Sequence, residues 1–189
     1  SYLGAPQTPT VAGQHVLDAD YFRRIDALNF TMAHDDGRLP DDLNEADIIL
    51  LGISRTSKTP TSIYLAQRGY KTTNVPLVPA LPFPEQIAGE HSAFVVCLIA
   101  SPDRIAEVRR NRALLLADRD LDDYVDRSRI AAEVAFTRKL CARHGWPVID
   151  VTRRSVEETA ATIISLMHDR KAGELTQGVE DVATQGQGK

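Results

Sequence analysis

The stretch Ala46–Ser62, which reads ADIILLGISRTSKTPTS, decides the fold that this sequence predicts. Within it, Asp47–Leu51 carries no charge after its first residue and ends at Gly52, which is typical of a fully buried strand. From that glycine onward the chain matches the phosphate-loop pattern G-x-x-x-x-G-K-[ST] except at its second glycine, with Lys58 and Thr59 as the closing pair. We therefore expect a strand, a phosphate-binding loop and a helix, in that order.

Each part of this loop has a physical use in binding phosphate. A glycine at the end of the strand lets the backbone turn sharply, so that consecutive N–H groups face an anion. Lys58 would reach the terminal phosphates, and Thr59 would place its hydroxyl on a bound Mg²⁺. The predicted nucleotide and phosphate site comprises Gly52, Ile53, Ser54, Arg55, Thr56, Ser57, Lys58 and Thr59.

Ser57 stands where the pattern has its second glycine. Because serine carries a Cβ, a positive φ here would make the loop differ from the common P-loop geometry. The alternative interpretation is an ordinary strand, turn and helix with a solvated lysine. The helix after the loop favours phosphate binding, since Pro60 fixes its first turn, Gly69 lies near its end, and its dipole points at the same anion.

The composition bounds the class of protein. With 189 residues, 43% of them hydrophobic, the chain can form one α/β domain with a sizeable core. The net charge of −4 comes from interspersed acids and bases, which argues against nucleic-acid and membrane-surface partners. No apolar run approaches bilayer length and Ser1–Thr10 does not read as a secretion signal. Cys97 and Cys141 lack metal-type spacing, so we expect two packed core thiols and a cytoplasmic protein.

Expected strands and helices alternate along the rest of the chain. Further strands are expected at Tyr70–Val78, Ala93–Ala100 and Val148–Val151. Helices are expected at Asp18–Ala33, after Thr59, after Ser101-Pro102, at Leu121–His144 and after a Ser155/Glu158 capping box. This alternation predicts an α/β fold of the P-loop type, with a doubly wound, mostly parallel sheet and flanking helices. Ligands bind such folds at the carboxyl ends of the strands, where Gly52, Ser101 and Thr152 fall.

The expected organisation has four parts. Residues 1–17 read as an arm or linker, 18–45 as a helix followed by a turn, 46–170 as the P-loop kinase-like α/β domain, and 171–189 as a flexible tail.

The turn His34-Asp35-Asp36-Gly37 follows the first expected helix. A histidine beside two carboxylates could hold a proton acceptor and a magnesium-organising acid in one tight turn. The alternative is that Asp-Gly only marks the turn and that His34 lies near a helix C-terminus because of the dipole.

A second candidate group is basic. Arg109 and Arg112 lie three residues apart on one face of an expected helix and could neutralise a transferring phosphate. A solvated basic helix face is the alternative interpretation.

Five blocks in order carry a resemblance to a known family. The sequence resembles the pyruvate, phosphate dikinase regulatory proteins, which are grouped with the phosphoenolpyruvate synthase regulatory proteins. The blocks are YFRRIDALNFTMAHDDGR (residues 21–38), ADIILLGISRTSKTPTSIYLA (46–66), GYKTTNVPLVP (69–79), RIAEVRRNR (104–112) and WPVIDVTRRSVEETAATI (146–163). TTNVPLV and YFRRI are more similar to the dikinase branch than to the synthase branch.

The resemblance implies a bifunctional serine/threonine kinase and phosphorylase. Such a protein inactivates the dikinase by moving a phosphoryl group from ADP to an active-site threonine. It reactivates the dikinase when inorganic phosphate attacks the phosphothreonine and releases pyrophosphate. On this sequence the resemblance implies catalytic roles for His34, Asp35, Asp36 and Lys58, with Mg²⁺ as the expected ion, and makes Ser57 a family-compatible residue.

The resemblance also bears on the extent of the chain and leaves alternatives open. Family members carry a further N-terminal α/β region ahead of the stretch equivalent to Ser1, so the sequence reads as a piece of a longer protein. The target could instead be phosphoenolpyruvate synthase. An ATP-dependent small-molecule kinase, a non-catalytic nucleotide-sensing module and a homodimer also remain open.

Overall fold

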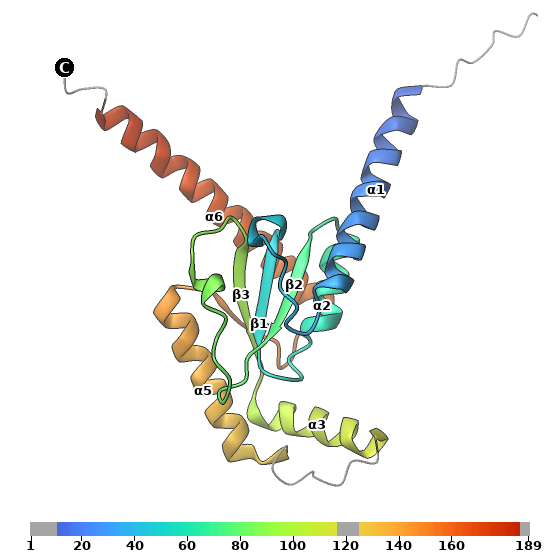
Figure 1. Cartoon of the computed structure of the whole chain (residues 1–189), viewed down its shortest axis with the longest axis vertical. Helices are drawn as coiled ribbons and strands as arrows, with labels where there is room; N and C mark the ends of the chain where they lie inside the picture. The colour runs from blue at the N-terminus through green and yellow to red at the C-terminus, as the bar shows by residue number, and fades with distance from the viewer. Residues whose placement is uncertain (1–10, 117–124, 186–189) are drawn as a thin grey trace, which may run out of the picture.

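Four parallel strands form one sheet at the centre of the chain (Figure 1). The computed structural model describes residues 11–116 and 125–185. The strands are β1 (Ile48–Gly52), β2 (Thr72–Pro76), β3 (Phe94–Ile99) and β4 (Val148–Asp150), in the order β2-β1-β3-β4. The register pairs Ile48 with both Thr72 and Phe94, and Cys97 with Val148. The bounds of all four strands lie within two residues of the predicted ones.

Helices flank this sheet and make the fold doubly wound. They are α1 (Val11–Ala33), α2 (Lys58–Gln67), α3 (Pro102–Leu116), α5 (Arg127–His144) and α6 (Val156–Gln185), with short 3₁₀ helices at Leu43–Glu45 and Glu85–Ala88. α2 packs on β1 and β2 and also contacts α6, whereas α5 packs against β3 (Figure 1). From β1 the chain connects to β2 on one side, whereas from β3 it connects to β4 on the other side. Because such connections between parallel strands are right-handed, their helices lie on opposite faces of the sheet. The predicted α/β fold is confirmed.

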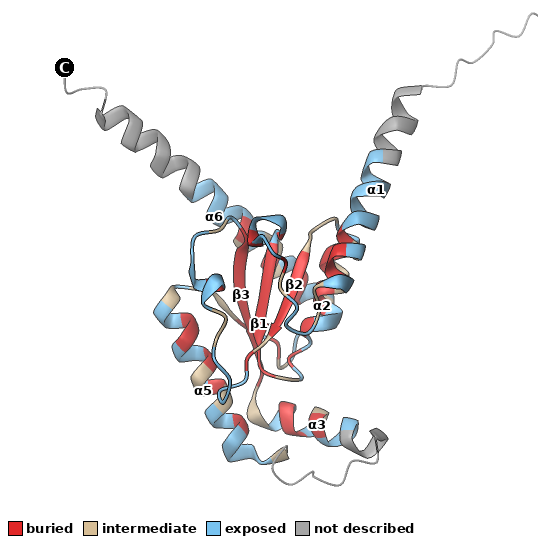
Figure 2. Cartoon of the chain, in the orientation of Figure 1, coloured by how far each residue is buried: buried red, intermediate tan, exposed pale blue. Residues whose placement is uncertain are grey.

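The sheet is buried because helices cover both faces (Figure 2). Every residue of β1 and β3 is buried, which explains why these strands read as continuous apolar runs without polar alternation. Ile48–Leu51 in β1 are each 0% exposed. The core therefore lies between the sheet and its helices and holds the loop after β1 in place.

The helix ends show where the sequence signals worked and where they did not. The capping box is confirmed, since Ser155 N donates to Glu158 Oε2 at 2.8 Å and Glu158 N donates to Ser155 Oγ at 3.1 Å. α1 begins at Val11, earlier than the expected Asp18, and α6 continues to Gln185 through much of the expected tail. The expected helical residues 121–124 lie outside the described part of the chain.

The two cysteines correct an expectation. Cys97 in β3 and Cys141 in α5 are both fully buried, as expected, but they form a disulfide bond and are not two separate thiols. They lie 44 residues apart in the sequence, and only the packing of α5 on β3 brings them together. Sequence spacing alone does not reveal such a pair.

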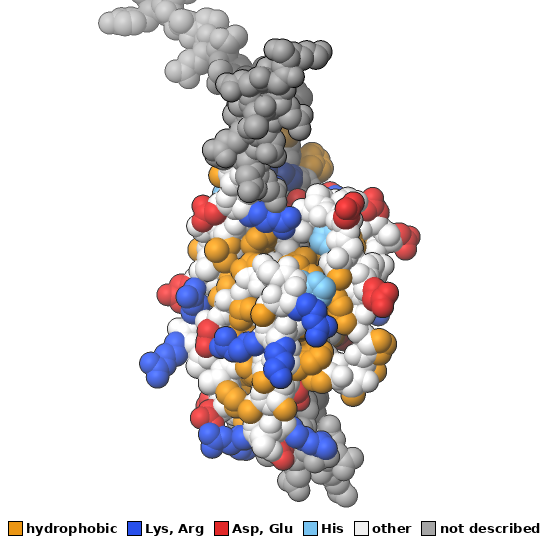
Figure 3. Space-filling view, turned by 90° about the vertical axis from the view of Figure 1, so that its left-hand side faces the viewer, with side chains coloured by type: hydrophobic (Ala, Val, Ile, Leu, Met, Phe, Trp, Pro, Cys, Tyr) orange, Lys and Arg blue, Asp and Glu red, His pale blue; other side chains and the backbone are white. Residues whose placement is uncertain are grey.

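The outer surface is mixed in charge and also exposes apolar side chains (Figure 3). On the side of the molecule where α5 lies, Lys and Arg side chains gather over the middle of the face and Asp and Glu lie mostly toward its margins (Figure 3). The net charge of −4 therefore does not describe each face. None of the helices in the described ranges combines the length and hydropathy needed to cross a bilayer.

Candidate functional site

The loop between β1 and α2 turns sharply and holds two residues other than glycine at positive φ. At Gly52 an added Cβ would lie 2.5 Å from Leu98 O and 2.8 Å from Thr56 Oγ1, so only glycine fits where the strand ends. Arg55 and Ser57 both adopt positive φ, at 70° and 59°. Ser57 thus takes the left-handed conformation for which the common pattern uses glycine, at a local cost in free energy.

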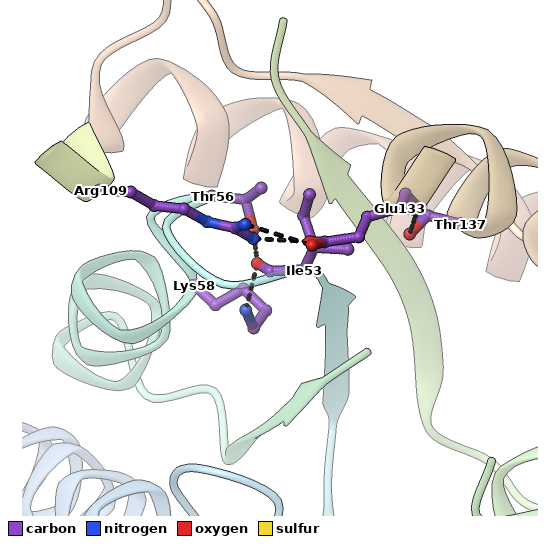
Figure 4. A network of polar contacts seen from close by, with 6 residues as sticks. All are labelled: Ile53, Thr56, Lys58, Arg109, Glu133 and Thr137. Carbon is purple, nitrogen blue, oxygen red and sulfur yellow. Dashed lines mark hydrogen bonds and ion pairs between the residues drawn. The ribbon is translucent and has the colours of Figure 1, made fainter. Parts of the chain in front are cut away.

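Lys58 folds back onto its own loop (Figure 4). The residue is 7% exposed, and its Nζ donates to Ile53 O at 2.9 Å, a carbonyl that also accepts from Thr56 Oγ1 at 2.9 Å. Burial lowers the pKa of Lys58 from 10.5 to about 8, although Asp36 and Asp35 nearby oppose this shift. The ammonium group is therefore a poorly solvated cation beside the loop, and an entering anion would stabilise it.

The turn predicted after the first helix is fastened to strand β2. α1 ends at Ala33, and both Asp36 and Gly37 take positive φ, at 56° and 86°. Gly37 N donates to Asn74 O at 2.8 Å and Asn74 N donates to His34 O at 3.2 Å. The turn thus occupies the edge of β2 and carries its two carboxylates to the end of the sheet where the loop lies.

His34 is turned away from this site. Its Nδ1 donates to Phe30 O at 2.8 Å, and its ring packs on the Phe30 ring with centroids 4.2 Å apart. His34 does not line the cavity that Asp35, Asp36 and Lys58 line. The structure therefore favours the alternative interpretation of His34, as a residue that ends α1.

Asp35, Thr59 and Asn74 form a polar cluster between the turn, α2 and β2. Thr59 Oγ1 donates to the Asp35 carboxylate, at 3.3 Å from Oδ1 and 3.4 Å from Oδ2. Asn74 Nδ2 donates to Asp35 Oδ1 at 2.5 Å and to Thr59 Oγ1 at 3.0 Å. Asn74 is 3% exposed, and its Oδ1 has no hydrogen-bond partner among the described residues. A buried acceptor without a donor is costly, so this cluster is suited to a further cationic ligand.

These oxygen atoms fit Mg²⁺ of the kind that nucleotide sites use. Carboxylate, hydroxyl and amide oxygens are its preferred ligands. In residues 11–116 and 125–185, no three His, Cys, Asp or Glu side chains converge into a metal cage. Asp35 and Thr59 could therefore hold the ion only together with the oxygens of a bound phosphate and water, which is how Mg²⁺ is held in most nucleotide sites.

A cavity of about 770 Å³ joins the loop and the turn. It lies at the carboxyl ends of the strands, where the connections after the paired strands β1 and β3 leave to opposite sides of the sheet, which is the place expected for a ligand in this class of fold. Asp35 and Asp36 line it from the turn. The loop contributes Ser54, Arg55, Ser57, Lys58 and Thr59, while Gly52, Ile53 and Thr56 are buried behind it.

The two candidate arginines do not line this cavity. Arg109 is 3% exposed and forms a two-point ion pair with Glu133 of α5, at 3.2 Å and 2.6 Å (Figure 4). Arg112 is exposed further along α3. Arg109 lies near enough to Lys58 to lower the pKa of that lysine, so it acts on the loop from behind.

Four polar residues that the site prediction missed also line the cavity: Asn74, Arg104, Thr152 and Arg154. Asn74 is the middle residue of β2, whereas the other three follow the ends of β3 and β4 within five residues. Arg104 is in the first turn of α3, whereas Arg109 lies farther from the strand. A short distance along the chain from the carboxyl end of a predicted strand was therefore the signal that could have found Arg104, Thr152 and Arg154.

Comparison with known proteins places the chain in a family. A model of the kinase/pyrophosphorylase family matches residues 1–164. A protein of Chelativorans sp. (strain BNC1) is 63% identical over 166 residues, which are 88% of this chain and 61% of the relative. Proteins of Rhizobium etli and Bradyrhizobium diazoefficiens are each 58% identical, over 87% and 90% of this chain and 61% and 62% of their own lengths.

All three relatives are named, provisionally, as pyruvate, phosphate dikinase regulatory proteins. The chain spans about three fifths of their length. Since the family model covers most of the chain, including the loop and the turn, the chain belongs to the kinase/pyrophosphorylase family.

Proposed function

We propose that this chain is the phosphotransfer part of a bifunctional regulator of pyruvate, phosphate dikinase. In one direction it moves the terminal phosphoryl group of ADP to an active-site threonine of the dikinase and inactivates it. In the other direction inorganic phosphate attacks the phosphothreonine, pyrophosphate leaves and the dikinase is reactivated. The names of the relatives support the partner, and the family supports the two chemistries.

One observation carries the proposal: a single cavity is lined both by the loop after β1, with Lys58, and by a pair of carboxylates. The loop amides and the Lys58 ammonium would bind the terminal phosphate of ADP. Asp36 lines the cavity, is exposed, and lies close enough to Lys58 to act on its pKa. A threonine hydroxyl that enters here would meet a proton acceptor beside the bound phosphate.

In the inactivating direction, the threonine oxygen forms a bond to the terminal phosphorus of ADP and the bridging P–O bond breaks, so AMP leaves. Asp36 accepts the hydroxyl proton. Lys58 and the loop amides neutralise the charge on the transferring group, because positioning and electrostatic stabilisation supply most of the catalysis in phosphoryl transfer.

In the activating direction, an oxygen of inorganic phosphate forms a bond to the phosphorus of phosphothreonine. The threonine P–O bond breaks, pyrophosphate forms, and Asp36 returns the proton to the threonine oxygen. Asp35 and Thr59 would hold Mg²⁺ with the phosphates, and the ion would add to the neutralisation of charge. Both directions thus use the same residues.

Transfer of label from ADP tests this proposal. The chain, and in parallel the whole-length relative from Rhizobium etli, is incubated with purified dikinase, Mg²⁺ and ADP labelled at its terminal phosphorus. We expect labelled phosphothreonine on the dikinase. Asp36→Asn should lower the rate by at least about a hundredfold, the usual contribution of a general base, with ADP affinity within about twofold. Arg110→Ala, an exposed control on α3, should change neither quantity.

The same assay separates the alternatives. Labelling of phosphoenolpyruvate synthase in place of the dikinase would move the proposal to the synthase branch. Label from ATP on a small molecule, and none from ADP on either enzyme, would indicate a small-molecule kinase. ADP binding without any transfer, by the chain and by the whole-length relative, would indicate a nucleotide-sensing module and overturn the proposed chemistry.

A further inference from the structure

The cavity has two ends of opposite charge. Asp35 and Asp36 lie at the end next to β2, because their turn is hydrogen-bonded to that strand. Arg104 follows β3 and Arg154 follows β4, and both line the other end. Lys58 follows β1 and lies between them in the sheet order β2-β1-β3-β4. Neighbouring strands lie about 4.8 Å apart, so the four strands next to these groups together span about 14 Å.

Hydrogen bonds tie the two loops at the basic end to each other. Ser101 N, after β3, donates to Thr152 Oγ1, after β4, at 2.8 Å. Thr152 N donates to Asp150 Oδ1 at 2.9 Å, and the Thr152 hydroxyl donates to the same atom. Arg104 N donates to Ser101 Oγ at 3.3 Å. The backbones that carry both arginines are therefore held in a fixed relation.

In the described part of the chain, the hydrogen bonds given for the Arg104 and Arg154 guanidinium groups are exposed to solvent. Arg104 Nη1 lies 2.9 Å from Glu107 Oε2, in an ion pair whose partners are 51% and 58% exposed. Arg154 Nη1 donates to Thr162 Oγ1 at 2.9 Å. An exposed ion pair contributes little to stability, so a phosphate that enters the cavity can replace these contacts at small cost. The same end opens into an adjoining hollow of about 390 Å³, which Thr152 and Arg154 share.

We propose that Arg104 and Arg154 form a second oxyanion subsite, which binds the phosphate on the far side of the transferring phosphoryl group from the acceptor hydroxyl. This inference rests on the proposed function and deepens it. In the ADP-dependent direction the subsite holds the phosphate of the departing AMP. In the phosphate-dependent direction it holds the inorganic phosphate that attacks.

The chemistry of in-line transfer explains why one subsite serves both directions. The bond that breaks when AMP leaves and the bond that forms when inorganic phosphate attacks lie on the same side of the transferred phosphorus, opposite the threonine oxygen. The order along the cavity, from the Asp36 carboxylate past Lys58 to the two arginines, reproduces the required order of acceptor, transferred group and far phosphate. Guanidinium groups suit this task because they bind phosphate oxygens in a fixed two-point geometry.

The test is ³¹P NMR of ADP bound to this chain, together with calorimetric affinities for ADP and AMP. ADP reports its two phosphorus atoms separately. In the double variant Arg104→Ala, Arg154→Ala we expect ADP and AMP to bind about tenfold more weakly, since charge-assisted hydrogen bonds are lost. The inner phosphorus of bound ADP should shift and the terminal one should not. Lys58→Met should produce the opposite pattern, with the terminal phosphorus shifted.

Controls and outcomes separate this inference from the proposed function. Arg110→Ala, on the same helix as Arg104 but outside the cavity, should bind ADP as the unsubstituted chain does. If Arg154→Lys replaces Arg154→Ala in the double variant, part of the lost ADP affinity should return. If the double variant keeps ADP affinity within twofold and the inner phosphorus does not move, the subsite is wrong while the proposed function stands. If the unsubstituted chain binds no ADP, the proposed function fails and this inference fails with it.

Discussion

Lys58 keeps its charge in the folded chain at a cost in stability. Burial lowers its pKa from 10.5 to about 8, which means that the folded chain binds this proton less tightly than the unfolded chain does. Below pH 8 both states are protonated and the full cost is present. As pH rises from about 8 to about 10.5, the folded lysine loses its proton first, so the free energy of unfolding should rise.

The variant Lys58→Met should therefore be more stable than the unsubstituted chain at pH 7 in the absence of nucleotide. We expect a gain of roughly 1 to 3 kcal/mol, because the desolvation of the charge is removed and a single hydrogen bond is lost. The gain should shrink as pH approaches 10. Urea denaturation at several pH values measures it, with the exposed Lys139→Met as control. Destabilisation at pH 7, or a gain that grows with pH, would contradict this account of Lys58.

Gly52 is the residue whose backbone the loop depends on most. Gly52→Ala should lower the free energy of unfolding by at least about 2 kcal/mol, since the new Cβ would collide with the backbone of β3 at Leu98 O. Gly173→Ala, in α6 where nothing lies within 4 Å of an added Cβ, should instead stabilise by up to about 1 kcal/mol. Thermal denaturation of the two variants makes the comparison, and equal effects would show that Gly52 is not sterically required.

At the scale of elements, the ion pair between Arg109 and Glu133 joins α3 to α5 behind the loop. Glu133→Ala should lower the free energy of unfolding by about 3 to 5 kcal/mol, because it leaves the buried Arg109 guanidinium without its carboxylate. Glu107→Ala removes a carboxylate from an exposed ion pair on the same helix and should cost less than about 1 kcal/mol. Urea denaturation compares them. A Glu133→Ala cost no larger than that of Glu107→Ala would mean that this pair does not hold the helices together.

The sequence predicted strands well where burial on both faces gives a continuous apolar run. β1 and β3 are covered on both faces, so their apolar runs are uninterrupted and unambiguous. Arg109 was harder, because it lies four residues after the fully buried Ile105 and thus on the inward face of α3, where an unpartnered cation is not expected. Its partner is on another helix, which local spacing does not show. The disulfide between Cys97 and Cys141 was missed for the same reason.

At the scale of the whole molecule, the fold turns separate segments into one site. The loop after β1 and the aspartate turn were each singled out from a local pattern, and one cavity is lined by both. What the sequence did not provide was their order across the sheet. That order places Asp35 and Asp36 at the β2 end of the cavity and brings Arg104 and Arg154 to the opposite end. Such relations depend on strand order, which a local pattern of residues does not specify.

The structure of this chain with ADP and Mg²⁺ bound tests the central claim most directly. The account predicts the terminal phosphate of ADP within hydrogen-bond distance of Lys58 Nζ and of the loop amides between Ser54 and Thr59, with Asp36 open to the acceptor side. Lys58 would then have released the Ile53 carbonyl. ADP bound elsewhere, with Lys58 still on Ile53 and the loop without phosphate, would contradict it.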